Sequence, residues 1–270
     1  MQVIHPQGMY NGLPPENVFI ALDDLGIELG VGYVIYQYQP HLDPECPLNL
    51  YFTMDCQPSA RYVLFGALLA RARQLRDANP NVGARAYTAV SPLDEAAQAF
   101  YRHNGLTLDS AEEMVGLQMP VGDGRIPMSC TVAAIPLNTQ EEQRALLQRL
   151  QQHDIQYVDG LYLNNLQHLP HFLALGLYRN TDLIGEIILA GEGDACELVT
   201  VYIVPGSRRQ GMGRALVHRC MAIMAAEGVT RVTCRTMTRS TPMRRLLTSF
   251  GAVTLGVNTL FPSIRLDNRL

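Results

Sequence analysis

The sequence predicts an α/β (α+β) protein made of two tandem copies of one domain, each a mixed, mostly antiparallel sheet flanked by helices. Segments rich in β-branched residues alternate with amphipathic segments along the whole chain. One order of elements, three strands, a helix, a strand, a helix and a strand, also occurs twice. The chain has 270 residues, 47% of them hydrophobic and 17% charged, which is enough apolar material for two cores.

The first half begins with a lead-in, residues 1–18, that is rich in proline and glycine and is expected to be irregular. Asn104 and Gly105 are expected to end the second helix of this half. Its elements are expected at 17–22, 30–39, 48–55, 84–90 and 114–119 for strands, and at 59–76 and 92–103 for helices.

The second half contains more helix. Thr139 and Glu142 form a capping box that opens a helix ending near His153, and a short helix is expected within 158–169. Further helices are expected from Met212 and over 242–250, and strands at 128–137, 171–178, 183–191, 196–204, 231–237 and 253–264. The joint is expected near 121–126, which gives domains at 1–122 and 127–270.

The stretch from Glu197 to Met224 carries the functional signal. A β-branched strand ends at Pro205, a glycine-containing loop follows, and an amphipathic helix begins at Met212. Gly211 and Gly213 let an anion approach the free N–H groups at the helix N-terminus. Two common phosphate motifs are excluded, because Lys and Ser/Thr do not follow Gly211, and Leu216 stands where a dinucleotide fingerprint needs its third glycine.

These residues match the pyrophosphate loop of the GNAT acetyltransferase superfamily, with Arg208, Gly211 and Gly213 at its defining positions. The resemblance covers roughly residues 128–270, with a fainter copy in the first half. It implies that acetyl-coenzyme A is the co-substrate and that its acetyl group passes directly to an amine. The donor-binding residues it implies are Val201, Tyr202 and Ile203 on the strand, and Arg208, Arg209, Gln210, Gly211, Met212, Gly213 and Arg214 in the loop and helix start.

By the same resemblance, Glu197 is the candidate general base. A strand with period two is expected to place Glu197, Val199, Val201 and Ile203 on one face. The competing interpretation is a carboxylate that is solvated or paired with Arg231 or Arg235.

The general acid departs from the family pattern, because Leu247 stands where many members have a tyrosine. The alternatives are a thiolate that leaves without an acid, or donation by Tyr202, Thr248 or Ser249. Tyr101 holds the corresponding position in the first half. Tyr157, Tyr162, His168 and His171 fall where acceptor loops lie in this family.

The first copy is expected to be degenerate. A shift of 147 residues aligns Pro58 with Pro205 and Arg61 with Arg208, but Leu64 and Phe65 then take the places of Gly211 and Met212. Bulky side chains would stand where a pyrophosphate needs bare backbone. The first half is therefore expected to bind coenzyme A weakly or not at all.

The leading functional prediction is an acetyl-coenzyme A-dependent N-acetyltransferase acting on a small amine or amino-acid derivative in the second domain. The first alternative is transfer of another acyl or aminoacyl group, since the tandem arrangement also resembles mycothiol synthase and, more distantly, N-myristoyltransferase. The second is a non-catalytic coenzyme A-binding sensor.

Composition argues against several other partners. A formal net charge of −4 gives no basic patch for nucleic acid or an anionic membrane. Six scattered cysteines and seven histidines show no metal-ligand spacing, so no metal is expected. No export signal is visible and a cytoplasmic protein is expected. Because a second copy can replace a partner subunit, a monomer is favoured over a homodimer.

Overall fold

A computed structural model describes residues 1–40, 43, 45–122 and 125–266 of the chain. The described chain forms two compact units. Unit 1 contains Met1–Ala111 and the segment that begins at Thr259, and unit 2 contains Glu112–Asn258. These bounds differ from the expected domains 1–122 and 127–270. Of the expected joint at 121–126, Asp123 and Gly124 lie outside the described residues.

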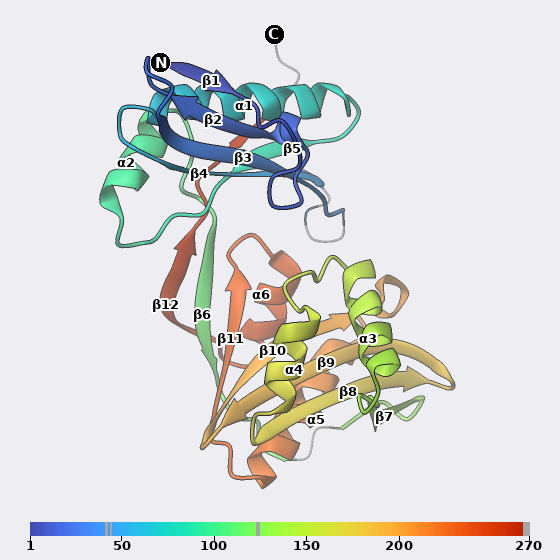
Figure 1. Ribbon diagram of the computed structural model, residues 1–270. Coiled ribbons are helices and arrows are strands. Elements are labelled where there is room, and N and C mark those ends of the chain that lie inside the picture. The colour runs from blue at the N-terminus through green and yellow to red at the C-terminus, as the bar shows by residue number, and fades with distance from the viewer. Residues whose placement is uncertain (41–42, 44, 123–124, 267–270) are drawn as a thin grey trace. The chain divides into compact units, whose positions relative to one another are not determined.

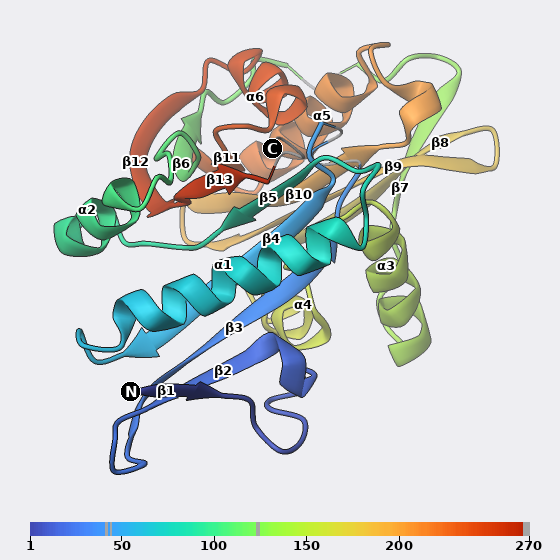
Figure 2. The same ribbon diagram turned by 90° about the horizontal axis from the view of Figure 1, so that it is seen from above.

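Unit 1 is a mixed sheet with helices packed on one face (Figures 1 and 2). Its strand order is β1-β2-β3-β4-β5-β13, and β4 and β5 form its parallel pair. The lead-in is less irregular than expected, because β1 pairs antiparallel with β2. The elements are β1 (Gln2–Ile4), η1 (Pro15–Asn17), β2 (Val18–Leu22), β3 (Glu28–Tyr38), β4 (Leu48–Cys56), α1 (Arg61–Asp77), β5 (Ala84–Tyr87), α2 (Glu95–His103) and β13 (Ser263–Arg265).

The core of unit 1 lies between this sheet and its helices. Leu64 and Leu68 of α1 are fully buried against Leu50 and Phe52 of β4. Helix α2 adds Phe100 and Tyr101, and it begins where the Asp94 carboxylate accepts a hydrogen bond from the Ala97 N–H at 2.9 Å. Helix α1 packs against β2, β3 and β4, and Figure 2 shows it lying over β3 and β4.

Unit 2 is a larger mixed sheet with the order β12-β6-β11-β10-β9-β8-β7. Within it β10 and β11 are the parallel pair. The elements are β6 (Ala111–Leu117), β7 (Cys130–Ala134), α3 (Gln140–Gln152), α4 (Gly160–Gln167), β8 (His171–Arg179), β9 (Asp182–Glu192), β10 (Ala195–Ile203), η2 (Pro205–Ser207), α5 (Met212–Ala226), β11 (Arg231–Met237), α6 (Thr241–Thr248) and β12 (Val253–Leu260).

Helices cover both faces of this sheet (Figure 1). On one face α5 buries Leu216, Cys220 and Met224, and these side chains belong to the larger apolar cluster of the unit. On the other face α3 and α4 bury Leu146, Leu150 and Leu163 in a second cluster. The expected capping box opens α3, with the Glu142 N–H donating to Thr139 Oγ1 at 3.2 Å.

The two halves exchange their closing strands. The sequence predicts that each half completes its own sheet, but β6 from the first half pairs with β11, from Val232↔Leu117 to Met237↔Glu112. At the end of the chain, β13 pairs with β5, from Ser263↔Tyr87 to Arg265↔Arg85. Both pairings are antiparallel, so each sheet gains an equivalent strand from the other half. Figure 1 shows β6 between β12 and β11.

Candidate functional site

The glycine loop of unit 2 leaves the N-terminus of α5 open. Gly211 is the N-cap residue and has a left-handed conformation with φ of 77°. No side chain caps the helix and its first turn carries no acidic residue. The first N–H groups of a helix lack internal partners, and the helix dipole favours an anion beside them. This helix start therefore has the geometry of an anion site.

Side chains of the loop hold its shape. The Arg208 Nε donates to the Ile203 carbonyl at 2.7 Å, and Gln210 donates to the Gly206 carbonyl at 3.2 Å. Arg179 in turn donates to the Gln210 side chain at 2.8 Å. Two of the predicted donor-binding residues thus act on the loop itself. Arg209 is exposed, as is Arg214 in the first turn of α5, whereas Met212 is buried and presents only its backbone.

The strands before this loop separate at a defined point. The parallel pairing of β10 with β11 runs from Ala195↔Arg231 to Leu198↔Cys234, and both strands then continue without pairing to each other. Beyond Leu198, the backbone groups of β10 that face β11 form no strand pairing with it. The hydroxyl of Tyr157 donates to the Val199 carbonyl at 3.0 Å, so this side chain reaches the point of separation.

A β-bulge lies at the same point and corrects one prediction. The register of β10 on β9 shifts between Leu198 and Thr200, so one extra residue interrupts the alternation of side chains. Val199 and Tyr202 pack in the α3/α4 cluster, whereas Val201 and Ile203 pack in the α5 cluster. The prediction that Glu197, Val199, Val201 and Ile203 share one face is therefore wrong beyond the bulge.

Glu197 is paired rather than free. Its Oε1 accepts a hydrogen bond from Arg235 Nε at 2.7 Å, and Arg235 also donates to the Tyr162 hydroxyl at 3.0 Å. The side chains of Glu197 and Arg235 are 27% and 42% exposed. The hydrogen bond that Arg235 donates to Glu197 raises the pKa of the guanidinium above its ordinary value. The structure thus contains the pairing that was the competing interpretation of Glu197.

The candidate acids lie in different surroundings. Tyr202 is buried, its hydroxyl donates to Glu186, and burial raises its pKa. Thr248 and Ser249 donate to backbone carbonyls of their own helix region, at 2.8 and 2.6 Å, and Leu247 is a core residue. Tyr157 is 61% exposed as a residue, but its hydroxyl end lies against the Val199 carbonyl, and desolvation of that end raises its pKa to about 12. Two phenols reach the point where β10 and β11 separate: Tyr157 bonds the Val199 carbonyl of β10, and Tyr162 accepts from Arg235 of β11.

A buried ionic cluster in unit 2 was not anticipated. Arg149 of α3 donates to both carboxylate oxygens of Glu186 at 2.6–3.0 Å, and Glu186 is 1% exposed. The His153 ring lies 4.1 Å from the Tyr202 ring. The sequence feature that could have indicated this cluster is Arg149, a charged residue beside Leu146 and Leu150 on the apolar stripe of a helix. Its partner could not be read from sequence.

Among the described residues, no group of three His, Cys, Asp or Glu side chains is placed to hold a metal ion. Of the helices the structure describes, none has the length and apolar character needed to cross a membrane.

Unit 2 thus contains a parallel strand pair, β10 and β11, that separates, followed by a glycine loop and the helix α5. Residues 138–252 match the model of the acetyltransferase (GNAT) family. Over this part of the chain, the match confirms the resemblance given by Arg208, Gly211 and Gly213.

Solved structures extend the fold likeness to nearly the whole chain. Eis1 from Mycobacterium abscessus is 11% identical with a TM-score of 0.54, over 93% of this chain and 64% of that one. A probable N-acyltransferase from Enterococcus faecalis is 12% identical with a TM-score of 0.55, over 91% and 61%. A GCN5-related N-acetyltransferase from Anabaena variabilis is 13% identical with a TM-score of 0.51, over 92% and 62%. No curated protein sequence matches the chain.

These comparisons confirm the predicted fold class, a mixed α/β chain with two GNAT-like domains. At such low identities they speak for the fold alone. The family match over residues 138–252, and not the solved structures, supports acyl transfer in general, because the family is described as one of acetyltransferases.

Proposed function

We propose that the chain is an acetyl-coenzyme A-dependent N-acetyltransferase, that unit 2 performs the transfer, and that the acceptor is a small amine or amino-acid derivative. One observation carries the proposal: the uncapped N-terminus of α5, opened by Gly211, directly follows the strand that separates from its parallel partner. An anion site and an unpaired strand edge together suit a long donor with a pyrophosphate and an amide-containing arm.

The donor contacts we propose are mostly backbone contacts. The N–H groups of Met212, Gly213 and Arg214 face the pyrophosphate, and the exposed Arg209 and Arg214 side chains add positive charge. Val201 offers its main chain to the arm of the donor. The Ile203 carbonyl already accepts from Arg208, so we assign it to holding the loop.

The acetyl thioester supplies an activated acyl group, and the chain must handle two protons. Glu197 is the proposed base that takes the proton of the acceptor ammonium, and Arg235 and Tyr162 fix its position. Tyr157 is the proposed acid: it gives its proton to the departing sulfur as the carbon–sulfur bond breaks, and the second proton of the attacking nitrogen, released as the amide forms, restores the phenol. Its raised pKa, about 12, keeps the phenol protonated until it is needed.

A titration with acetyl-coenzyme A tests the donor site. Calorimetry on the wild type, Gly211→Leu and Gly66→Leu offers a matched comparison, because a Cβ at either glycine would meet no atom within 4 Å. Gly66 lies within α1, where a leucine keeps an ordinary helical conformation. Gly211 has a positive φ, and any residue with a side chain pays about 1–2 kcal/mol to adopt it. Circular dichroism checks that both variants stay folded.

We expect one site in the wild type and in Gly66→Leu, and none in Gly211→Leu. Binding that survives in Gly211→Leu would refute the loop assignment. If a site is lost with Gly66→Leu, unit 1 binds the donor. A folded protein that binds acetyl-coenzyme A, yet releases no thiol with any amine of a broad panel, would be the sensor alternative.

A further inference from the structure

Unit 1 contains a cavity of about 300 Å³. It lies where β4 and β5 separate: their parallel pairing ends at Tyr51↔Tyr87, and β4 alone continues to Cys56. Ligands of α/β proteins commonly bind beyond the carboxyl ends of parallel strands. Its polar lining includes Asp55, Cys56, Arg61, Thr88, Asp94 and Tyr101.

This cavity lacks the loop that a pyrophosphate would need. The shift that aligns the two halves places Arg61 to Leu64 opposite Arg208 to Gly211. In unit 1 those four residues form the first turn of α1, whereas in unit 2 they are the loop before α5. Leu64 and Phe65 are buried in the core. The volume is at the lower end of the roughly 300–1,000 Å³ typical of small-molecule pockets, so the cavity fits a compact ligand.

A cation in the cavity is available to a ligand. The Arg61 guanidinium lies 5.4 Å from the centre of the Phe100 ring. Burial raises the pKa of the Cys56 thiol, and the adjacent Arg61 opposes that rise, so the two groups are neighbours. None of the carboxylates that the structure describes forms an ion pair with Arg61. A guanidinium beside an aromatic ring in a pocket is well suited to a bidentate carboxylate.

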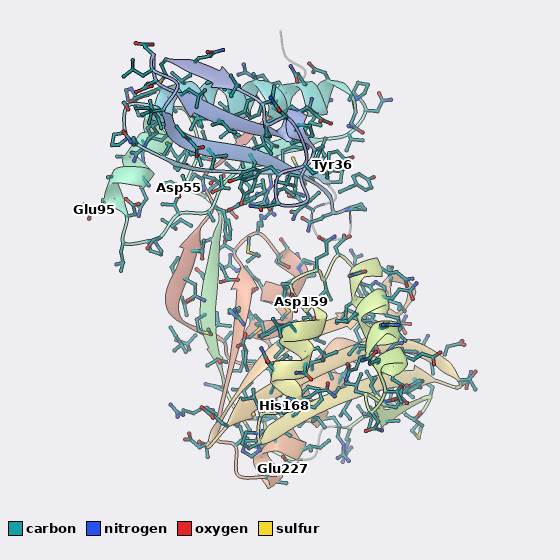
Figure 3. The ribbon with its side chains drawn as sticks, in the orientation of Figure 1. Tyr36, Asp55, Glu95, Asp159, His168 and Glu227 are labelled. Carbon is teal, nitrogen blue, oxygen red and sulfur yellow. The ribbon has the colours of Figure 1, made fainter. Side chains whose placement is uncertain are left out.

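Two carboxylates line the same cavity. Asp55, marked in Figure 3, is exposed at the end of β4, and no basic group of the described residues pairs with it. Asp94 caps α2 through the Ala97 N–H. The hydroxyls of Thr88 and Tyr101 also line the cavity, as neutral hydrogen-bonding groups. A ligand that satisfies this lining carries a negative group for Arg61 and a positive group for the carboxylates.

We propose that the cavity of unit 1 binds a small zwitterion, an α-amino acid or a compact derivative of one, with its carboxylate on Arg61 and its ammonium beside Asp55 and Asp94. This site is separate from the donor site of unit 2. The proposal stands whether or not unit 2 transfers acetyl groups.

Calorimetry on the full chain tests the proposal, with each of the common amino acids as the probe at millimolar concentration. Acetate and ethylamine serve as probes that carry a single charge. At least one amino acid is expected to bind roughly tenfold or more tightly than either single-charge probe. If no amino acid binds, or acetate binds as tightly as the best one, the proposal is wrong.

Variants locate the site. Arg61→Gln is expected to weaken amino-acid binding roughly tenfold or more, because a charged hydrogen-bonding partner is lost. Arg73→Gln is the matched control, since Arg73 is exposed on the same helix and does not line the cavity. Equal binding in Arg61→Gln and Arg73→Gln would refute the location.

Two further measurements distinguish a direct loss of amino-acid binding in unit 1 from unfolding and from an effect on unit 2. Asp55→Asn, on an exposed side chain, is expected to weaken amino-acid binding but not acetate binding; unchanged amino-acid binding would refute the ammonium contact. Acetyl-coenzyme A affinity, measured on the same proteins, is expected to be the same in Arg61→Gln and the wild type. If Arg61→Gln loses both amino-acid and acetyl-coenzyme A binding, the substitution acts by disturbing the fold. The result with Asp55→Asn then decides whether the proposed amino-acid site stands.

Discussion

The buried carboxylate of Glu186 provides a sharp test of how unit 2 is held together. It is 1% exposed and accepts hydrogen bonds from Arg149 and Tyr202. Through these bonds it connects α3 to β9 and β10. Arg149→Met keeps an apolar side chain of similar length but leaves the carboxylate buried without its guanidinium.

The expected cost can be worked from these contacts. Removing one partner of a buried ion pair costs about 3–5 kcal/mol, because the other charge is left uncompensated. The Arg149 side chain is 32% exposed, so water reaches part of the pair and the lower end, about 3 kcal/mol, is expected. Adding Glu186→Gln removes the stranded charge, and the double variant should regain about 1–2 kcal/mol over Arg149→Met.

Urea unfolding followed by circular dichroism measures these differences, and hydrogen exchange of peptides from α3, β9 and β10 localises them. Arg231→Met is the control, because Arg231 also pairs with a carboxylate at 2.7 Å, that of Asp194, but both side chains are mostly exposed. Its unfolding midpoint should match the wild type. A loss below about 1 kcal/mol in Arg149→Met, or a double variant no more stable than it, would refute the reasoning.

Three other predictions follow from the same structure. Glu197→Gln should lower the acetyl-transfer rate by roughly 10²–10⁴-fold at unchanged acetyl-coenzyme A affinity, with Asp194→Asn as the control; equal rates would remove Glu197 as the base. Because the pKa of Tyr157 is raised from 10.0 to about 12, its buried hydroxyl contributes stability below pH 10 that is lost as pH rises toward 12. Tyr157→Phe should therefore show a smaller alkaline loss of stability in pH-dependent melting, and an unchanged alkaline limb would contradict the burial of this hydroxyl. A fragment of residues 112–258 should unfold cooperatively, whereas 127–258 lacks β6, exposes the edge of β11 and should associate in size-exclusion chromatography; two equally monomeric fragments would count against the exchange.

Sequence reasoning succeeded where local chemistry decides the structure. The glycine loop needs a residue that tolerates positive φ at Gly211, and the helix after it needs an apolar stripe, so both are visible in the chain. The capping box at Thr139 is equally local. The candidate site was less predictable, because the partners of Glu197 and Glu186 come from distant segments. Arg235 could be named only as one of two alternatives, and Arg149 was not named.

The bulge at Val199 shows a second limit. A period-two pattern assigns faces only while the register is unbroken, and the hydrophobic residues from Leu198 to Ile203 suit either face of a sheet covered by helices on both sides. Nothing in the polarity of these residues marks the extra one. The effect is large, because it places Tyr202 in the ionic cluster of α3 and points Val201 and Ile203 toward α5.

The strand exchange could not be predicted for a similar reason, because it depends on pairing between segments that are far apart in the sequence. β6 pairs antiparallel with β11, and β13 pairs antiparallel with β5. The edges of β5 and β11 that receive these strands offer the same kinds of backbone donors and acceptors. Local sequence specifies a strand but not which of two equivalent edges it joins. The exchange makes each sheet depend on chain from the other half, so a boundary drawn between the two repeats would cut through both sheets. A repeat found in the sequence therefore identifies the copies of a domain without identifying the segments that fold together.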